Sequence, residues 1–284
     1  NDIKFIIYHR ECYNFSKSHI RGFKSFLAKN NFYWKLVDCF IFHNEFYKKV
    51  FSNNLKILKN KTEVIGPLRF SKMKFLKKNN NYNKNKKITF FAFTPSYAAW
   101  VHSNKYNKYE KNPNPFGNIS YYLKTKLIKN KYEREIYFYE AFIQSNIIFA
   151  KNALRFPEYE FEIKLKWKDS RWIGLIYKII KIKLGKHPKN LVISYDSDVW
   201  SKIHKSFLVC GYGSTTLLEA GYLKTPSAQF ICGELLDKKF KNRNRIISHY
   251  KSFKLIKNTR DLTNLIENKS NLFSKKLYKM QKNN

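Results

Sequence analysis

The chain has 284 residues, of which 43% are hydrophobic and 18% aromatic, so it can bury a core and is not a disordered basic tail. Lys and Arg number 56 against 20 Asp and Glu, which gives a formal net charge of +36. An excess of this size can serve a polyanionic partner. The lysines are spread over the whole chain, however, and this favours the codon bias of an AT-rich genome over a dedicated nucleic-acid surface.

The four cysteines lie far apart, and no pair of cysteines, or of cysteine and histidine, has the spacing of metal ligands. This pattern indicates a reducing compartment, no disulfide framework and no bound metal. No run of apolar residues approaches the roughly 20 needed to span a bilayer. We therefore expect a cytoplasmic protein that is soluble, or peripheral at the inner face of the plasma membrane.

Strands and helices alternate along the chain, beginning with the stretch that precedes residue 76. Its expected strands are 4–8, 37–42 and 62–65, and its expected helices are 16–30 and 43–51. A run rich in Lys, Asn and Tyr follows at 76–86 and is expected to be a linker between domains. Fewer residues precede it than the about 100–150 typical of a domain. The amino-terminal domain, 1–75, is therefore expected to be short or, since the chain starts at Asn1, truncated.

The second half opens on another apolar strand and continues the same alternation. Its expected strands are 87–93, 161–166, 191–194, 207–211 and 226–231. Its expected helices are 132–154, 198–205, 214–224, 260–268 and 271–282. Residues 94–125 have little periodicity and are expected to form a long loop. The alternation predicts an α/β fold with mostly parallel sheets, in which ligands bind at the carboxyl ends of the strands.

The strongest candidate for a binding site is a turn between a strand and a helix. A buried strand ends at Gly211, the turn contains Gly213, and a helix begins at Ser214 or Thr215. The first amides of a helix lack partners within it, and the helix dipole adds partial positive charge there. The hydroxyls of Ser214, Thr215 and Thr216 add further donors. This combination predicts a phosphate-binding site.

Glu219 lies one helical turn further along and can accept hydrogen bonds from the hydroxyls of a ribose. The alternative is an ordinary strand-turn-helix unit, in which Ser214 caps the helix and Glu219 lies in solvent. If Glu219 binds a nucleotide, Glu219→Ala is expected to abolish binding and leave the fold intact.

The segment 213–221 reads Gly-Ser-Thr-Thr-Leu-Leu-Glu-Ala-Gly and is followed by Lys-Thr-Pro at 224–226. It resembles the carboxyl-terminal domain of GT-B-fold glycosyltransferases, which often show Thr-x-x-Glu-Ala and then Gly-x-Pro. The likeness is closest to enzymes of bacterial surface polymers: capsule and lipopolysaccharide transferases and the glycerophosphotransferases of teichoic acid synthesis. It covers roughly 88–268, with a motif of about 20 residues.

This resemblance implies a GT-B-like pair of Rossmann-like domains with parallel sheets. The carboxyl-terminal domain, 87–284, would bind the nucleotide donor, and the amino-terminal domain would face the acceptor. Gly213, Ser214, Thr215 and Thr216 would then contact the donor diphosphate, and Glu219 the ribose.

The implied activity is the transfer of a sugar, or of a glycerol-phosphate-like group, from a nucleotide-linked donor to a glycan or lipid-linked acceptor. A helix terminus that stabilises the leaving group makes a metal dispensable, and no cofactor is expected. One alternative is a nucleotide-sugar epimerase of the same architecture. Another is a non-catalytic, basic nucleic-acid-binding protein that uses the aromatic residues Trp167, Trp172 and Tyr195.

Further candidate residues follow other strands of the second half. Lys164 and Lys166 can neutralise the donor phosphates, where the resembled family has a basic residue or His-Pro; the alternative is that both lysines are solvated. The resemblance implies that Tyr195 stacks near the nucleotide base. The triplet 196–198, Asp-Ser-Asp, is either a helix cap or, if its carboxylates held Mg²⁺, a sign of a GT-A-like enzyme.

A candidate catalytic base follows the first strand, in the domain that the resemblance assigns to the acceptor. Transfer with inversion needs one group to take the proton of the acceptor hydroxyl. His9, which titrates near neutrality, is the first candidate and Glu11 the second. His43 and Glu45 are weaker ones.

The segment 172–185 has apolar residues on one side of a helical projection and lysines on the other. It fits an amphipathic helix at an anionic membrane surface. It fits equally a helix that faces the core and exposes a basic side.

Overall fold

The computed structural model describes residues 4–8, 24–25, 28–29, 31–42, 45–54, 60–65, 85–92, 138–165, 172–212, 214–236 and 253–268. They fall into two compact units, the first within 1–77 and the second within 78–243 and 252–284. Most of the predicted helix 16–30, the linker apart from residues 85 and 86, the loop 94–125 and the helix 271–282 lie outside the described residues.

The first unit contains a three-stranded parallel sheet in the order β1-β2-β3. Its elements are β1 (Ile6–Tyr8), α2 (Asn31–Trp34), β2 (Cys39–Phe42), α3 (Glu45–Asn54) and β3 (Thr62–Val64). Phe51 of α3 packs against the sheet, with its ring 4.4 Å from that of Phe40 and 5.1 Å from that of Phe42. The three predicted strands are confirmed, whereas the short helix α2 was not expected from the sequence.

The second unit is built on a six-stranded sheet in which all neighbouring strands are parallel. Its strands are β4 (Lys87–Phe91), β5 (Glu160–Lys164), β6 (Leu191–Ser194), β7 (Ser206–Gly211), β8 (Ser227–Phe230) and β9 (Lys254–Ile256). They lie in the order β6-β5-β4-β7-β8-β9. The predicted α/β class with parallel sheets is therefore confirmed, and only β9 was missed.

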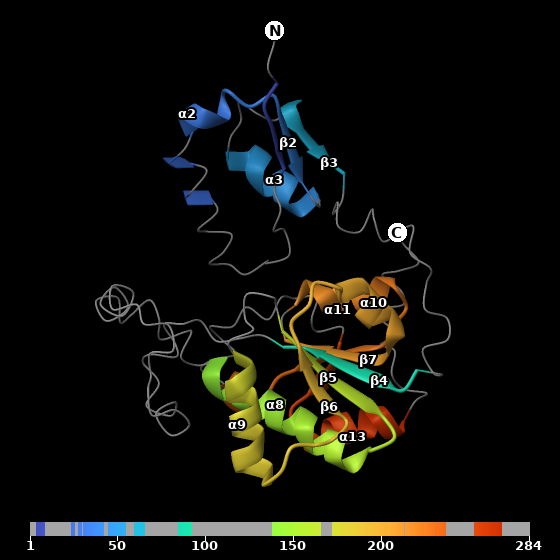
Figure 1. Ribbon diagram of the computed structural model, residues 1–284. Coiled ribbons are helices and arrows are strands. Elements are labelled where there is room, and N and C mark those ends of the chain that lie inside the picture. Colours follow the sequence, from blue (N-terminus) through green and yellow to red (C-terminus); the bar gives the residue numbers. More distant parts are fainter. Residues whose placement is uncertain are drawn as a thin grey trace, which may run out of the picture. The chain divides into compact units, whose positions relative to one another are not determined.

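Helices cover both faces of this sheet (Figure 1). One face carries α8 (Phe138–Arg155), α9 (Ile173–Leu184) and α13 (Thr259–Glu267), and the other α10 (Val199–Lys205) and α11 (Thr215–Tyr222). A 3₁₀ turn, η4 (Gly233–Leu236), lies between β8 and β9 in the sequence. Because the sheet is covered on both sides, every residue of the central strand β7 is buried.

Aromatic rings fill the space between the sheet and α8. Phe90 of β4 lies 5.5 Å from Phe149 of α8 and 4.7 Å from Phe230 of β8, measured between ring centroids. Phe149 in turn contacts Phe161 of β5 at 5.1 Å. These four side chains are fully buried. Their packing holds β4, β5 and β8 against α8. It thereby also holds in place the carboxyl ends of these strands.

The helix α9 faces the core and not a membrane. Its apolar residues Ile176, Ile179 and Ile180 are fully buried, and the helix packs against α8. Trp172, which precedes it, is also buried, with its ring 5.6 Å from that of Phe142. The apolar side is thus unavailable to lipid, and the core-facing alternative is the one that the structure shows. The Trp172 ring is equally unavailable for stacking on a nucleic-acid base.

Two glycines of α9 should respond oppositely to alanine. Gly185 caps the helix at φ +73°, where a Cβ is strained, so Gly185→Ala should destabilise the protein by about 1 kcal/mol. Gly174 lies within the first turn, with nothing within 4 Å of a Cβ built on it. Gly174→Ala should therefore stabilise the protein by about 0.5 kcal/mol. Urea unfolding of both variants checks this, and equal stabilities would contradict it.

Candidate functional site

The order of the strands marks one point on the sheet as the expected binding site. From β4 the chain first builds outward through β5 and β6, and then returns to the other side of β4 to build β7, β8 and β9. Numbered by sequence, this is the order 3-2-1-4-5-6 of Rossmann-type nucleotide-binding sheets. In such sheets the loops after the two strands at the reversal diverge to opposite faces, and ligands bind in the crevice between them. Here that point lies between the carboxyl ends of β4 and β7.

The register brings two sequence-predicted positions to this point. Phe91, the last residue of β4, pairs with Lys164 on one side and with Gly211 on the other. With strands about 4.8 Å apart, the backbones of Lys164 and Gly211 lie about 10 Å from each other on either side of β4. Lys164 and Gly211 are 47 positions apart in the chain. They thus lie at the same level on either side of β4, where the strand order reverses.

The turn after Gly211 leads into α11 as the sequence predicts. Ser214 is the N-cap: its Oγ accepts a hydrogen bond from the Thr216 amide at 3.2 Å and donates one to Thr216 Oγ1 at 3.0 Å. Thr215 is the first helical residue and is half-buried. The helix start therefore carries hydroxyl side chains at the carboxyl end of β7, and the amide of Thr216 is already capped by Ser214. Gly213 lies outside the described residues.

Gly211 allows the strand and the helix to come close together. A Cβ at this position would lie 3.1 Å from Cδ2 and 3.2 Å from Cγ of Leu217, closer than ordinary van der Waals contact. Leu217 is fully buried on the first turns of α11. A larger residue at 211 would therefore require the side chain of Leu217 to shift.

Glu219 is fully buried, with no exposed surface. Its Oε2 accepts a hydrogen bond from Nε1 of Trp200 at 3.1 Å, which joins α11 to α10. The alternative of an ordinary strand-turn-helix unit predicted that Ser214 caps the helix, which is confirmed, and that Glu219 lies in solvent, which is wrong. Burying a carboxylate is costly unless it is hydrogen-bonded, so its burial next to the predicted phosphate turn favours a specific role. Trp200 was not among the residues expected from the sequence.

The loop between β6 and α10 is shaped by its two aspartates. Asp198 caps α10 by accepting from the Ser201 amide at 3.1 Å, and Asp196 accepts from the Asp198 amide at 3.1 Å. Asp196 also pairs with Lys202 at 2.9 Å. The expected cap cluster is therefore present. Tyr195, at the start of this loop, is 51% exposed and can present its ring to a ligand.

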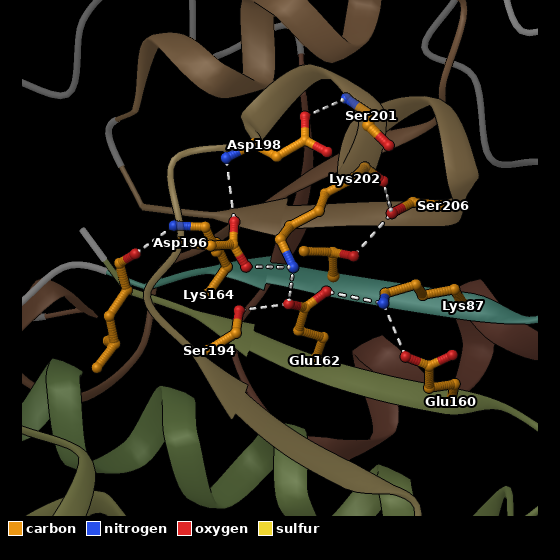
Figure 2. A network of polar contacts seen from close by, with 12 residues as sticks. Lys87, Glu160, Glu162, Lys164, Ser194, Asp196, Asp198, Ser201, Lys202 and Ser206 are labelled. Atoms are coloured by element: carbon orange, nitrogen blue, oxygen red, sulfur yellow. Dashed lines mark hydrogen bonds and ion pairs between the residues drawn. The ribbon is translucent and has the colours of Figure 1, made fainter. Parts of the chain in front are cut away.

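Beneath α10, a network of charges centres on Glu162, which is 2% exposed (Figure 2). Its carboxylate pairs with Lys202 and with Lys87, the latter at 2.9 Å, and accepts a hydrogen bond from Ser194. Burial alone would raise the pKa of Glu162, but the hydrogen bonds from Lys202, Ser194 and Lys87 outweigh it and hold the pKa below its ordinary value. Glu162 lies within the strand expected at 161–166, but nothing in the sequence singled it out.

Lys164 is 4% exposed and not solvated, which overturns one alternative drawn from the sequence. Its ammonium group donates to the carbonyl oxygen of Leu165. Burial lowers its pKa most, and the nearby Asp196 and Glu162 raise it in part. A buried cation beside the reversal of strand order can neutralise an anion, because a charge is screened less there than in water.

Several candidates from the sequence fall outside the described residues: His9, Glu11, His43, Lys166 and Trp167. Glu45 is the first residue of α3 in the first unit, and it is exposed. Among the residues that the structure describes, no group of three or more His, Cys, Asp or Glu side chains could hold a metal ion. None of the described helices is long and apolar enough to cross a membrane.

No protein-family model matches the chain, and no curated protein matches it. Solved structures do. Accessory secretory proteins 1, 2 and 3 of Streptococcus pneumoniae match 90% of this chain and 42% of theirs, with 8% identity and a TM-score of 0.46. The wall teichoic acid polymerase TagF matches 96% of this chain and 56% of its own, with 13% identity and a TM-score of 0.44.

HepE of Anabaena, solved in complex with UDP and glucose, matches 94% of this chain and 62% of its own, with 11% identity and a TM-score of 0.41. The chain thus spans about half the length of these structures.

Proposed function

We propose that the second unit binds a nucleotide-linked sugar or a similar donor, and that the chain is a transferase of the GT-B glycosyltransferase type. The observation that most supports this is the position of the turn at Gly211–Ser214, at the reversal of a Rossmann-type strand order. The fold alone does not specify a reaction. We choose a transferase because the motif at 213–226 also resembles the carboxyl-terminal domain of GT-B enzymes.

In this proposal the donor diphosphate lies at the start of α11. The amides of its first turn and the hydroxyls of Ser214, Thr215 and Thr216 would bind phosphate oxygens. Lys164, across β4, would balance the remaining negative charge, with Lys166 as a further candidate. Charge that develops on a leaving diphosphate is thereby stabilised by groups that are already in place. Such a site needs no metal to do so.

The nucleoside would extend toward α10. Glu219 would accept hydrogen bonds from the ribose hydroxyls, and the exposed ring of Tyr195 would stack on the base. The acceptor would be a glycan or a lipid-linked saccharide. His9, or failing that Glu11, would take the proton of its attacking hydroxyl.

Isothermal titration calorimetry with a panel of UDP-, CDP- and CMP-linked sugars tests the proposal. We expect saturable binding of at least one donor and weaker binding of the corresponding free nucleoside, because the phosphates supply part of the affinity. A repeat at higher salt separates this site from a nucleic-acid surface, whose affinity for DNA or RNA falls steeply with salt. If no member of the panel binds, the proposal is wrong.

A further inference from the structure

Trp200 contacts the carboxylate of Glu219 from a different helix. It is the second residue of α10, half-buried, and its ring N–H points to Oε2 of Glu219 at 3.1 Å. An indole offers one donor and no acceptor. A hydrogen bond from it to a carboxylate is charge-assisted and directional, so it restricts the rotation of the Glu219 side chain.

The position of Trp200 is itself fixed from the sheet. Lys202, two residues further along α10, pairs with Glu162 of β5 and with Asp196. Asp198 caps the beginning of the same helix. The helix that carries Trp200 is therefore anchored to the sheet by Lys202 and capped by Asp198, and its indole in turn contacts the carboxylate of Glu219. A side chain supported in this way can hold a ligand-binding group in one orientation.

We infer that Trp200 is a positioning residue, which orients the carboxylate of Glu219 toward the ribose hydroxyls and so makes the site selective for ribonucleotides. The inference rests on the proposed function. It assigns to Trp200 no contact with the nucleotide. Trp200 would act only through the contact of Glu219 with the ribose. Its loss should therefore reduce the preference for ribose over dideoxyribose and should not change the binding of the phosphates.

The test compares the dissociation constants of UDP and CDP with those of their 2′,3′-dideoxy analogues. The unaltered chain should prefer the ribonucleotide by roughly 10- to 100-fold, the range for losing hydrogen bonds to a charged group. In Trp200→Phe, which keeps a ring but has no N–H, this preference should fall at least about threefold. Affinity for the dideoxy analogue should change less than twofold.

Two further variants separate positioning from packing. In Trp200→His, Nε2 is as many bonds from Cβ as Nε1 is in tryptophan, so this variant should retain more of the preference than phenylalanine does. Trp172→Phe removes another tryptophan N–H, at the start of α9 and against Phe142 of α8, and should leave the preference unchanged. Circular dichroism and thermal unfolding check that each variant is folded.

The outcomes separate the two proposals. If Trp200→Phe is folded and weakens both members of a pair equally, Trp200 only supports the packing of α10, and the inference is wrong. The inference is also wrong if the unaltered chain binds both members of a pair equally. If the unaltered chain binds neither UDP, CDP nor any linked sugar, the proposed function fails, and this inference fails with it.

Discussion

Glu219→Ala is expected to weaken nucleotide binding about 100-fold. The proposed site uses this carboxylate for the two ribose hydroxyls, and a hydrogen bond to a charged group contributes about 1.5–3 kcal/mol. The variant must be compared at equal folding, because Glu219 is fully buried and accepts from Trp200. Alanine leaves a cavity and an indole N–H without this partner, so the fold should lose stability as well. The sequence alone had predicted an intact fold.

Glu219→Gln keeps the volume of the side chain and an oxygen that can accept from Trp200. It should be close to the unaltered chain in stability and weaken binding about 10-fold, because the charge is lost. Glu267→Ala is the matched control: its side chain is 44% exposed and pairs with Arg155 at the end of α8. Calorimetry with the donor that binds best measures all three. A folded Glu219→Ala protein with affinity within threefold of the original would contradict a ribose-binding role.

Glu162→Ala should lower the free energy of unfolding by about 3 kcal/mol. It removes the anion shared by Lys87 and Lys202, whose side chains are 21% and 15% exposed, and leaves these charges in a poorly hydrated place. The comparison is Glu160→Ala, on the same strand. Glu160 also pairs with Lys87, at 2.7 Å, but its side chain is 54% exposed, so its loss should cost less than about 1 kcal/mol. If Glu162→Ala and Glu160→Ala lose the same free energy of unfolding, the burial of Glu162 does not add to the stability of the network.

The stabilisation by Glu162 should depend on pH. Because the folded protein lowers the pKa of Glu162 below its ordinary value of 4.5, the contribution is fully present above pH 4.5. It is lost as the pH falls through the folded-state pKa, where the carboxylate takes up a proton. The difference in unfolding free energy between the unaltered chain and Glu162→Gln should thus be constant from pH 7 to about pH 5 and shrink below. Urea unfolding followed by tryptophan fluorescence checks both predictions.

The elements of the second unit could be predicted from the sequence because most of them are marked locally. The apolar run ending at Gly211 predicts a buried strand, and Ser214 and Asp198 predict helix starts. The strand β9 was missed because its two apolar residues stand between Lys254 and Lys257, with neither a longer apolar run nor a Gly-Pro turn beside them. The helix α2 is a single turn, too short for a helical periodicity to be recognised.

The candidate site could be predicted only in part. A strand at 161–166 was predicted, with Lys164 and Lys166 on one side of it, but not the burial of Glu162 and Lys164. The lysines that pair with Glu162 belong to β4 and α10, and nothing in the sequence around them identifies their partner. Likewise Trp200 was read only as part of a short helix, since a tryptophan in such a place more often packs than positions a ligand-binding group.

The sequence by itself determined the turn after β7 and its helix cap. Those contacts join near neighbours in the chain: the Ser214 hydroxyl caps the amide of Thr216, and Asp198 that of Ser201. Only the tertiary structure decided where the turn lies, because strand order and register placed it beside β4 and level with Lys164. It also decided the contacts of Glu219 with Trp200 and of Glu162 with Lys202, which join residues 19 and 40 positions apart. Such contacts form only when two separate helices pack on one sheet, and no local pattern encodes them.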